Sequence, residues 1–105
     1  MTLGSARPVP VLFEFPDDPG RQECWGRFAE LRSDGAVLAS AAPVDKGARL
    51  RLRFDLPGGD SVSGLEGDVL RSRRDGDGYC EAVLVWRLCA ARLKLNRALN
   101  RLFAA

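Results

Sequence analysis

The sequence contains no histidine and only three cysteines, and these absences exclude several classes of site. Without histidine, the usual zinc ligand sets and the Ser/His/Asp and Cys/His catalytic systems cannot be assembled. The cysteines are Cys24, Cys80 and Cys89; they form no CxxC arrangement, and three thiols cannot all pair with one another. We therefore expect a protein that is not an enzyme, with no catalytic residues, no metal site and buried, reduced cysteines.

Long apolar runs and a strong charge excess are also missing. No window approaches the roughly 18 to 20 apolar residues of a membrane span, and residues 1–10 lack the apolar core of a signal peptide. The 16 basic and 14 acidic residues leave a formal charge of +2, which is low for a protein that binds nucleic-acid phosphates. We expect a cytoplasmic protein without membrane insertion and without a nucleic-acid partner.

The residues that are present suit one small folded unit. The chain has 105 residues, of which 46% are hydrophobic and 29% charged, as in ordinary globular domains. We expect a single domain over residues 1–105. It would comprise a flexible N-terminal arm at 1–8, a β-barrel at 9–87 and a C-terminal helix at 90–104.

Alternating apolar and polar residues predict six short strands. The clearest alternation is at 49–56, where Leu and Phe share one face while Arg shares the other. The least regular is 23–32, where we expect a bulge near Gly26. Residues 79–87 are apolar on both faces, which predicts a strand that is central or covered by a helix. The expected strands are 9–15, 23–32, 36–40, 49–56, 61–73 and 79–87.

The hydrophobic period changes near the C-terminus. Residues from about Ala90 carry an apolar stripe at helical spacing and contain no glycine or proline, which predicts an amphipathic helix. The fold class is therefore all-β with one C-terminal helix: a six-stranded antiparallel β-barrel capped by an α-helix. The expected stripe is formed by Leu88, Ala91, Leu95, Leu99 and Leu102.

Three segments carry a resemblance to a known family. Residues 30–38 resemble a D/N-x-S-x-x-G motif followed by small and apolar residues, 47–57 resemble a G-x-x-L-x-L-x-F-x-L-P strand, and 67–71 resemble a G-x-V-V-R strand. In this order they are similar to the PilZ domain, and the similarity covers nearly the whole chain. The resemblance implies a six-stranded barrel of a family that typically serves as a receptor for the bacterial messenger cyclic di-GMP.

The same resemblance shows where this chain departs from a messenger-binding member. The family grips the messenger with two arginines in an RxxxR arm, because guanidinium groups bind phosphates and guanine edges. Here Arg7 matches the second position, and Leu3 stands at the first. In the second motif Glu30 and Arg32 replace Asp/Asn and Ser, and Gly35, the one retained residue, is also explained by the turn. The resemblance thus implies an eroded site at Arg7, Glu30, Arg32 and Gly35, with no bound cofactor.

Three functional interpretations follow. The first is a signalling or adaptor protein of bacterial motility, type IV pilus or virulence regulation that acts through protein partners. The second is a direct cyclic di-GMP receptor that uses Arg7, Arg32 and Gly35 in an altered pose, with Arg71, Arg73 and Arg74 as compensating charges. The third is a small barrel that binds nucleic acid through Trp25 and the basic tail.

For the first interpretation, Trp25, Arg97 and Arg101 are the expected partner surface. Tryptophan and arginine are enriched in interface hot spots, and the tail after Trp86 carries five basic residues and no acidic ones. The alternative for the tail is an ordinary solvated helix face. Trp86 lies in a strand that is apolar on both sides and is expected in the core. The paired acids Asp17–Asp18 and Asp75–Asp77 are expected to serve turns.

Overall fold

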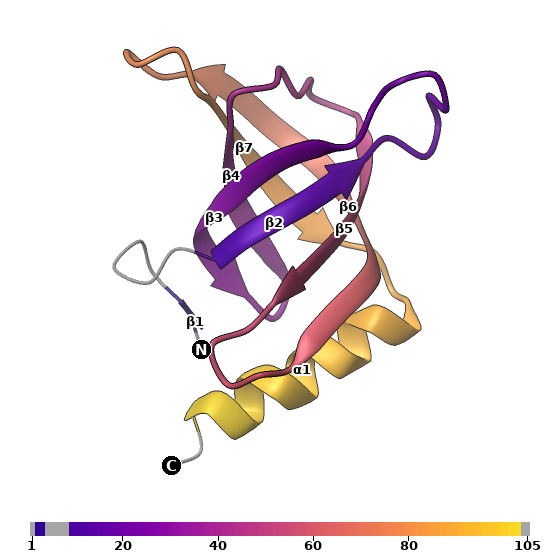
Figure 1. Ribbon diagram of the computed structural model, residues 1–105, viewed down its shortest axis with the longest axis vertical. Helices are drawn as coiled ribbons and strands as arrows, with labels where there is room; N and C mark the ends of the chain where they lie inside the picture. The colour runs from indigo at the N-terminus through magenta and orange to yellow at the C-terminus, as the bar shows by residue number, and fades with distance from the viewer. Residues whose placement is uncertain (1, 4–8, 104–105) are drawn as a thin grey trace.

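The computed structural model describes residues 2–3 and 9–103, which form seven strands and one helix (Figure 1). Each expected strand is present within two residues of its expected ends, as is the C-terminal helix. The short strand β1 has no counterpart among the expected elements. The elements are β1 (Thr2–Leu3), β2 (Val9–Glu14), β3 (Cys24–Arg32), β4 (Gly35–Ser40), β5 (Arg49–Asp55), β6 (Ser61–Arg74), β7 (Cys80–Trp86) and α1 (Ala90–Phe103).

Six of the strands close into an antiparallel barrel, as expected. The strand order is β3-β2-β5-β6-β7-β4, and an additional β3–β4 pairing joins the two ends of this series. β1 pairs with β3 beyond the end of the β2–β3 ladder, with Leu3 opposite Leu31 and Thr2 opposite Arg32. Closure leaves no long unpaired strand edge in the described barrel.

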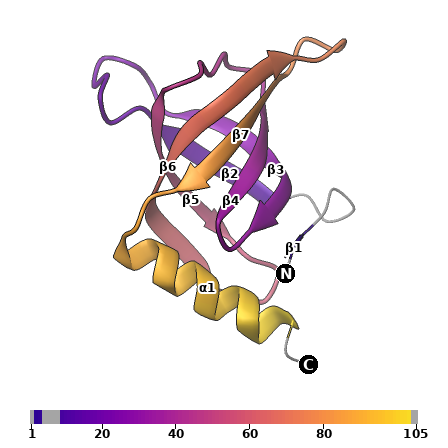
Figure 2. The ribbon, with the colours of Figure 1, turned by 180° about the vertical axis from the view of Figure 1, so that it is seen from behind.

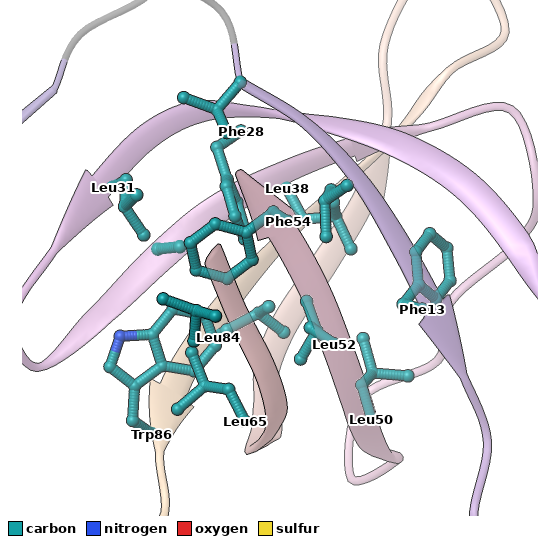
Figure 3. Close-up of a cluster of buried hydrophobic side chains, with 14 of the residues drawn as sticks. Phe13, Phe28, Leu31, Leu38, Leu50, Leu52, Phe54, Leu65, Leu84 and Trp86 are labelled. Carbon is teal, nitrogen blue, oxygen red and sulfur yellow. The ribbon is translucent and has the colours of Figure 1, made fainter. Parts of the chain in front are cut away.

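The barrel interior is filled by the apolar residues of each alternating pattern. In β5, Leu50, Leu52 and Phe54 are buried, whereas the arginines between them lie outside. Phe28 packs against two other aromatic rings: its ring centroid is 4.9 Å from that of Phe54 and 6.1 Å from that of Trp86, both edge-on (Figure 3). Burial of these side chains supplies the main driving force for folding, at about 1.5–3 kcal/mol for each large one.

Helix α1 closes one end of the barrel and contacts β6 (Figures 1 and 2). Its buried residues include Leu95, Ala98 and Leu99. The expected stripe is wrong at Leu88, which precedes the helix and is 88% exposed. The helix begins at Ala90, so the helical period does not extend back to that position.

Strand β7 is central, between β6 and β4, but no helix of the described chain covers its outer face. Its core-facing residues are buried, whereas Val85 on the outer face is 42% exposed. The expectation of a central strand is confirmed. The helix that could have covered its outer face instead covers the end of the barrel.

Of two strand irregularities, one differs from its expected position and the other lies at a glycine. The bulge in β3 lies between Phe28 and Glu30 and not at Gly26. Gly26 is needed for close packing, because a Cβ there would lie 2.8 Å from the carbonyl oxygen of Ala39. In β6, Gly64 adopts a φ of 71° at an irregularity of the β5–β6 ladder, as expected for a glycine at a bend.

Candidate ligand and partner surfaces

The β3–β4 turn carries the positions at which the PilZ resemblance places messenger contacts. Glu30 and Arg32 flank the fully buried Leu31, so their side chains lie on the outer face of β3. Trp86, which is 2% exposed, holds the turn: its indole N–H donates to the carbonyl of Arg32 (3.1 Å) and its backbone N–H to that of Asp34 (3.0 Å). The core position expected for Trp86 is confirmed, and the turn is fixed to the end of β7.

The charges at this turn are unfavourable for an anionic ligand. The Arg32 Nε lies 3.6 Å from Asp34 Oδ1, so an adjacent carboxylate offsets its positive charge. Glu30 adds a second carboxylate on the same strand. A dinucleotide with two phosphates would therefore meet one guanidinium and two carboxylates here.

Gly35 is required by packing. A Cβ at this position would lie 2.1 Å from the carbonyl oxygen of Leu84, because β4 and β7 approach closely here. Its φ is not positive, so the turn itself does not demand a glycine, contrary to the expected explanation. The one retained motif residue is thus explained by the barrel without any ligand.

Thr2 and Leu3 pair with the same end of β3. Leu3 is paired with Leu31, and Val9 with Phe28. Arg7 and the other residues at 4–8 lie outside the described residues, so the expected flexibility there stays a prediction. Leu3, at the first RxxxR position, has no hydrogen-bond donor in its side chain.

Among Arg71, Arg73 and Arg74, the arginines expected to compensate for the altered motif, Arg71 lies in the same cross-strand row as Glu30. Pairing across the barrel links Glu30 to Val37, Val37 to Val83 and Val83 to Arg71. Three strand spacings separate the ends of this row, about 14 Å. The side chain of Arg73 binds Glu81 (3.3 Å), and Arg74 donates to the carbonyl of Gly78 (3.4 Å). Arg71 is therefore the member best placed to act beside the motif.

The basic and acidic side chains on the outer face of β2 and β5 are paired with one another. The three arginines of β5 each contact carboxylates: Arg49 with Asp17 (2.7 Å), Arg51 with Glu14 (3.2 Å) and Arg53 with Glu23 (3.3 Å). Such exposed pairs contribute little stability, about 0–1 kcal/mol each. They do, however, leave this face without the excess charge that would attract a charged partner.

One further ion pair joins β6 to the residue after β7. Both oxygens of Asp68 accept hydrogen bonds from Arg87, at 3.0–3.2 Å. This hydrogen bonding, with the charge of Asp68, raises the pKa of the Arg87 guanidinium. Arg87 therefore stays charged at any physiological pH.

Of the acidic loop residues, Asp75 acts in its turn, as expected, whereas the carboxylate of Asp17 binds Arg49 of β5. Asp75 Oδ1 accepts from the backbone N–H groups of Asp77 (2.9 Å) and Tyr79 (3.0 Å), which shapes the β6–β7 hairpin. Within residues 2–3 and 9–103, no three histidine, cysteine or acidic residues gather as a metal site would need. Cys80 is buried as expected, whereas Cys24 and Cys89 are half-buried, and all three are free thiols.

Trp25 projects from the outer face of β3 and is 66% exposed. It borders two hollows: one of about 520 Å³ beside Leu12 and Arg53, and one of about 190 Å³ that reaches Tyr79. The Arg27 guanidinium lies 6.0 Å from the centre of the Tyr79 ring. The sequence alone does not select Arg27 or Tyr79. Tyr79 comes close to Trp25 and Arg27 only because β3 pairs with β4 and β4 pairs with β7.

The exposed side of α1 is basic. Arg97 and Lys94 are exposed beside the exposed Leu93, and the helix contains no acidic residue. Arg101 binds Asp60 of the β5–β6 turn at 2.9 Å, so it also holds the helix on the barrel. Of the two helix arginines expected at a partner surface, Arg97 is thus the more available. No helix in the described ranges has the length and apolar character needed to cross a bilayer.

The sequence alone did not indicate a further exposed surface, the outer face of β4 and β7. The outer face of β4 and β7 bears Val37, Val83 and Val85, and Leu70 of β6, 49% exposed, lies beside them. The apolar character of both faces of β7 was visible in the sequence. It predicts a strand that is central or covered by a helix; β7 is central, and no helix of the described chain covers its outer face.

Comparison with known proteins identifies the fold. No protein-family model matches the sequence, and no curated protein matches it. Among solved structures, the PilZ domain of CeSA from a cellulose-synthesizing bacterium matches with a TM-score of 0.67 and 18% identity over 97% of both chains.

Two further structures agree. The inhibitor of motility MotI/DgrA of Bacillus subtilis matches with a TM-score of 0.67 and 17% identity over 94% of this chain. MrkH of K. pneumonia in its apo state matches with a TM-score of 0.71 and 10% identity over 99% of this chain. The present chain spans half the length of each of these two proteins. The PilZ-like fold expected from the sequence is confirmed.

Proposed function

We propose that this protein is a PilZ-type signalling adaptor that acts through protein contacts and has lost tight binding of cyclic di-GMP. The observation that carries the proposal is the state of the β3–β4 turn. Arg32 stands where the family has a short serine and lies 3.6 Å from Asp34, while Gly35 is accounted for by packing against Leu84. The motif therefore retains the glycine that barrel packing requires and lacks the side chains that would bind an anionic messenger.

The arm supports the same conclusion. Leu3 pairs with β3 next to the motif, so an arginine at this position would be close to the ligand. Each lost bidentate contact to a base costs about 1–3 kcal/mol, or roughly five- to 150-fold in affinity. Loss of the first arginine together with the altered turn is expected to turn micromolar into millimolar binding.

Calorimetric titration with cyclic di-GMP tests the loss. The wild-type protein is expected to bind more weakly than about 100 µM, and the double variant Leu3→Arg, Arg32→Ser at least tenfold more tightly. The control Leu93→Arg adds the same side chain as Leu3→Arg, but on the exposed side of α1, and should gain nothing. If the double variant remains folded and gains no affinity, the assignment of these two positions is wrong.

The direct-receptor alternative has one observation in its favour. Arg71 lies in the same row as Glu30 and could supply positive charge to a ligand on this face. This alternative predicts wild-type binding tighter than about 10 µM that is lost in Arg7→Ala and in Arg71→Ala. Such a result would replace the adaptor proposal.

Two surfaces are suited to protein partners. Trp25 is exposed beside Arg27 and Tyr79, and this combination of residue types is enriched in interface hot spots. The basic side of α1, with Arg97, suits an acidic partner. Proteins retained from a native extract by the immobilised wild type should be lost with Trp25→Ala or with Arg97→Glu, which leaves the Arg101–Asp60 contact intact. The control Lys46→Glu, in an exposed loop, should leave them unchanged; if all variants retain the same proteins, these surfaces are not used.

A further inference from the structure

The outer face of β4 and β7 combines an apolar centre with charged ends. Val37 and Val83 are paired and half-buried, whereas Val85 and Leu70 are among the most exposed aliphatic residues of the barrel. Figure 2 shows β4 and β7 on the viewer's side of the barrel, with α1 below them and no described element across them. A contiguous group of apolar side chains on the outside of a domain marks a surface that other molecules contact.

Strand pairing arranges this face in an ordered row. Across β3, β4, β7 and β6 the outward side chains are Glu30, Val37, Val83 and Arg71. An acid therefore lies at one end, a base at the other and two valines between them. Neither Glu30 nor Arg71 forms an ion pair with another residue of the described ranges.

A two-fold axis along the strands, midway between β4 and β7, reverses the order of this row. Glu30 of one copy then meets Arg71 of the other, and Val37 meets Val83, at both ends of the contact. We propose that two copies of this chain associate through the outer face of β4 and β7, with these residues at the interface. Self-complementarity of one surface is what a two-fold symmetric dimer requires.

The neighbouring row fits the same axis. Gly35 pairs with Val85, and Val85 with Asp68, while Arg32 lies one position beyond the Leu31–Ala36 pair. The axis places Val85 of each copy over Gly35 of the other, where no side chain obstructs it. It also brings Arg32 of each copy towards Asp68 of the other, but Asp68 is already bound to Arg87 and Arg32 lies beside Asp34. The second row is thus sterically compatible with the axis, and the charge complementarity rests on the first row.

The other candidate surfaces do not fit a second copy. The exposed side of α1 is basic, so two copies of it would repel each other.

The third row of the β4–β7 face limits the contact. There the axis would bring Arg27 of one copy towards Arg73 of the other, which is already bound to Glu81. The contact therefore centres on the first two rows. A convex barrel face of this extent is at the small end of specific interfaces, so we expect a dissociation constant of tens to hundreds of micromolar.

Sedimentation equilibrium at loading concentrations from 10 µM to 1 mM tests the proposal. The wild type is expected to be in monomer–dimer exchange over this range. Glu30→Arg and Arg71→Glu should each weaken the dimer about tenfold or more, because each reversal opposes like charges at two symmetric contacts. An equimolar mixture of the two variants should recover dimer, since every contact between unlike chains is then attractive.

Each alternative outcome contradicts the proposal. A wild type that stays monomeric at 1 mM, or single variants that dimerise as well as the wild type, would overturn it. So would a mixture that behaves as the sum of its components while circular dichroism shows both variants folded. A dimer lost in Trp25→Ala or Leu93→Ala and unaffected by Val83→Asp would place the contact on another surface. The dimer does not depend on the adaptor proposal, since its readout is mass and not messenger binding.

Discussion

The substitution Gly35→Ala separates the structural role of the motif glycine from any role in ligand binding. A Cβ at this position would lie 2.1 Å from the carbonyl oxygen of Leu84, well inside van der Waals contact. That oxygen belongs to the backbone of a central strand and cannot rotate away, so β4 and β7 would have to separate. Overpacking in a core costs about 1–3 kcal/mol, and a rigid backbone neighbour places this case near 3 kcal/mol.

The size of this loss is large relative to the stability of a small domain. Domains of this size are stable by about 5–15 kcal/mol, and 1 kcal/mol changes the melting temperature by about 4–8 °C. Gly35→Ala is therefore expected to lower the melting temperature by at least 10 °C. Urea unfolding followed by fluorescence of the buried Trp86 gives the free-energy difference directly.

Gly76→Ala is the matched control. Gly76 lies in the β6–β7 turn, a Cβ there would meet nothing within 4 Å, and its φ is not positive. Removing a glycine at such a site leaves stability unchanged or raises it by up to about 1 kcal/mol. If Gly35→Ala cost less than about 1 kcal/mol, the packing explanation of the retained glycine would be refuted.

Three further predictions concern the two tryptophans and the helix. In urea titrations Trp86→Phe should lower the free energy of unfolding by about 2–3 kcal/mol, because it removes the hydrogen bond to the Arg32 carbonyl and leaves space in the core. Trp25→Phe should change the free energy of unfolding by less than about 0.5 kcal/mol. Acrylamide should quench mainly Trp25, so Trp25→Phe should abolish most of the quenchable fluorescence; unchanged quenching would contradict the exposed position of Trp25. Leu99→Ala should cost about 2–5 kcal/mol and Leu93→Ala under 0.5 kcal/mol by thermal melting, and equal losses would refute the orientation of α1.

The strands and the helix were predictable because their apolar periods are regular. In β5 the alternation of leucine and arginine fixes which face is buried, and closure of the barrel then follows from the number of strands and the turns between them. β1 was not predictable, because Thr2 and Leu3 are too few for a period. Its pairing depends on the free edge that β3 offers beyond the end of β2.

The site was only partly predictable for a similar reason. The family resemblance selects Glu30, Arg32 and Gly35 as candidate positions, but the packing reason for the glycine lies in Leu84, 49 positions away in the sequence, and appears only when β4 and β7 are paired. Glu30 and Arg71 likewise fall in one outward-facing row only because β4 and β7 pair between their strands. The apolar residues on both faces of β7 predict a strand that is central or covered by a helix, and they do not tell which of the two applies.

The most direct test of the central claim is an NMR titration of ¹⁵N-labelled protein with cyclic di-GMP up to 1 mM. If the fold has kept the turn and lost the messenger contacts, the amide signals of Arg32 and Gly35 should stay in place or shift linearly without reaching saturation. Saturating shifts of these signals at ten micromolar ligand would contradict the account.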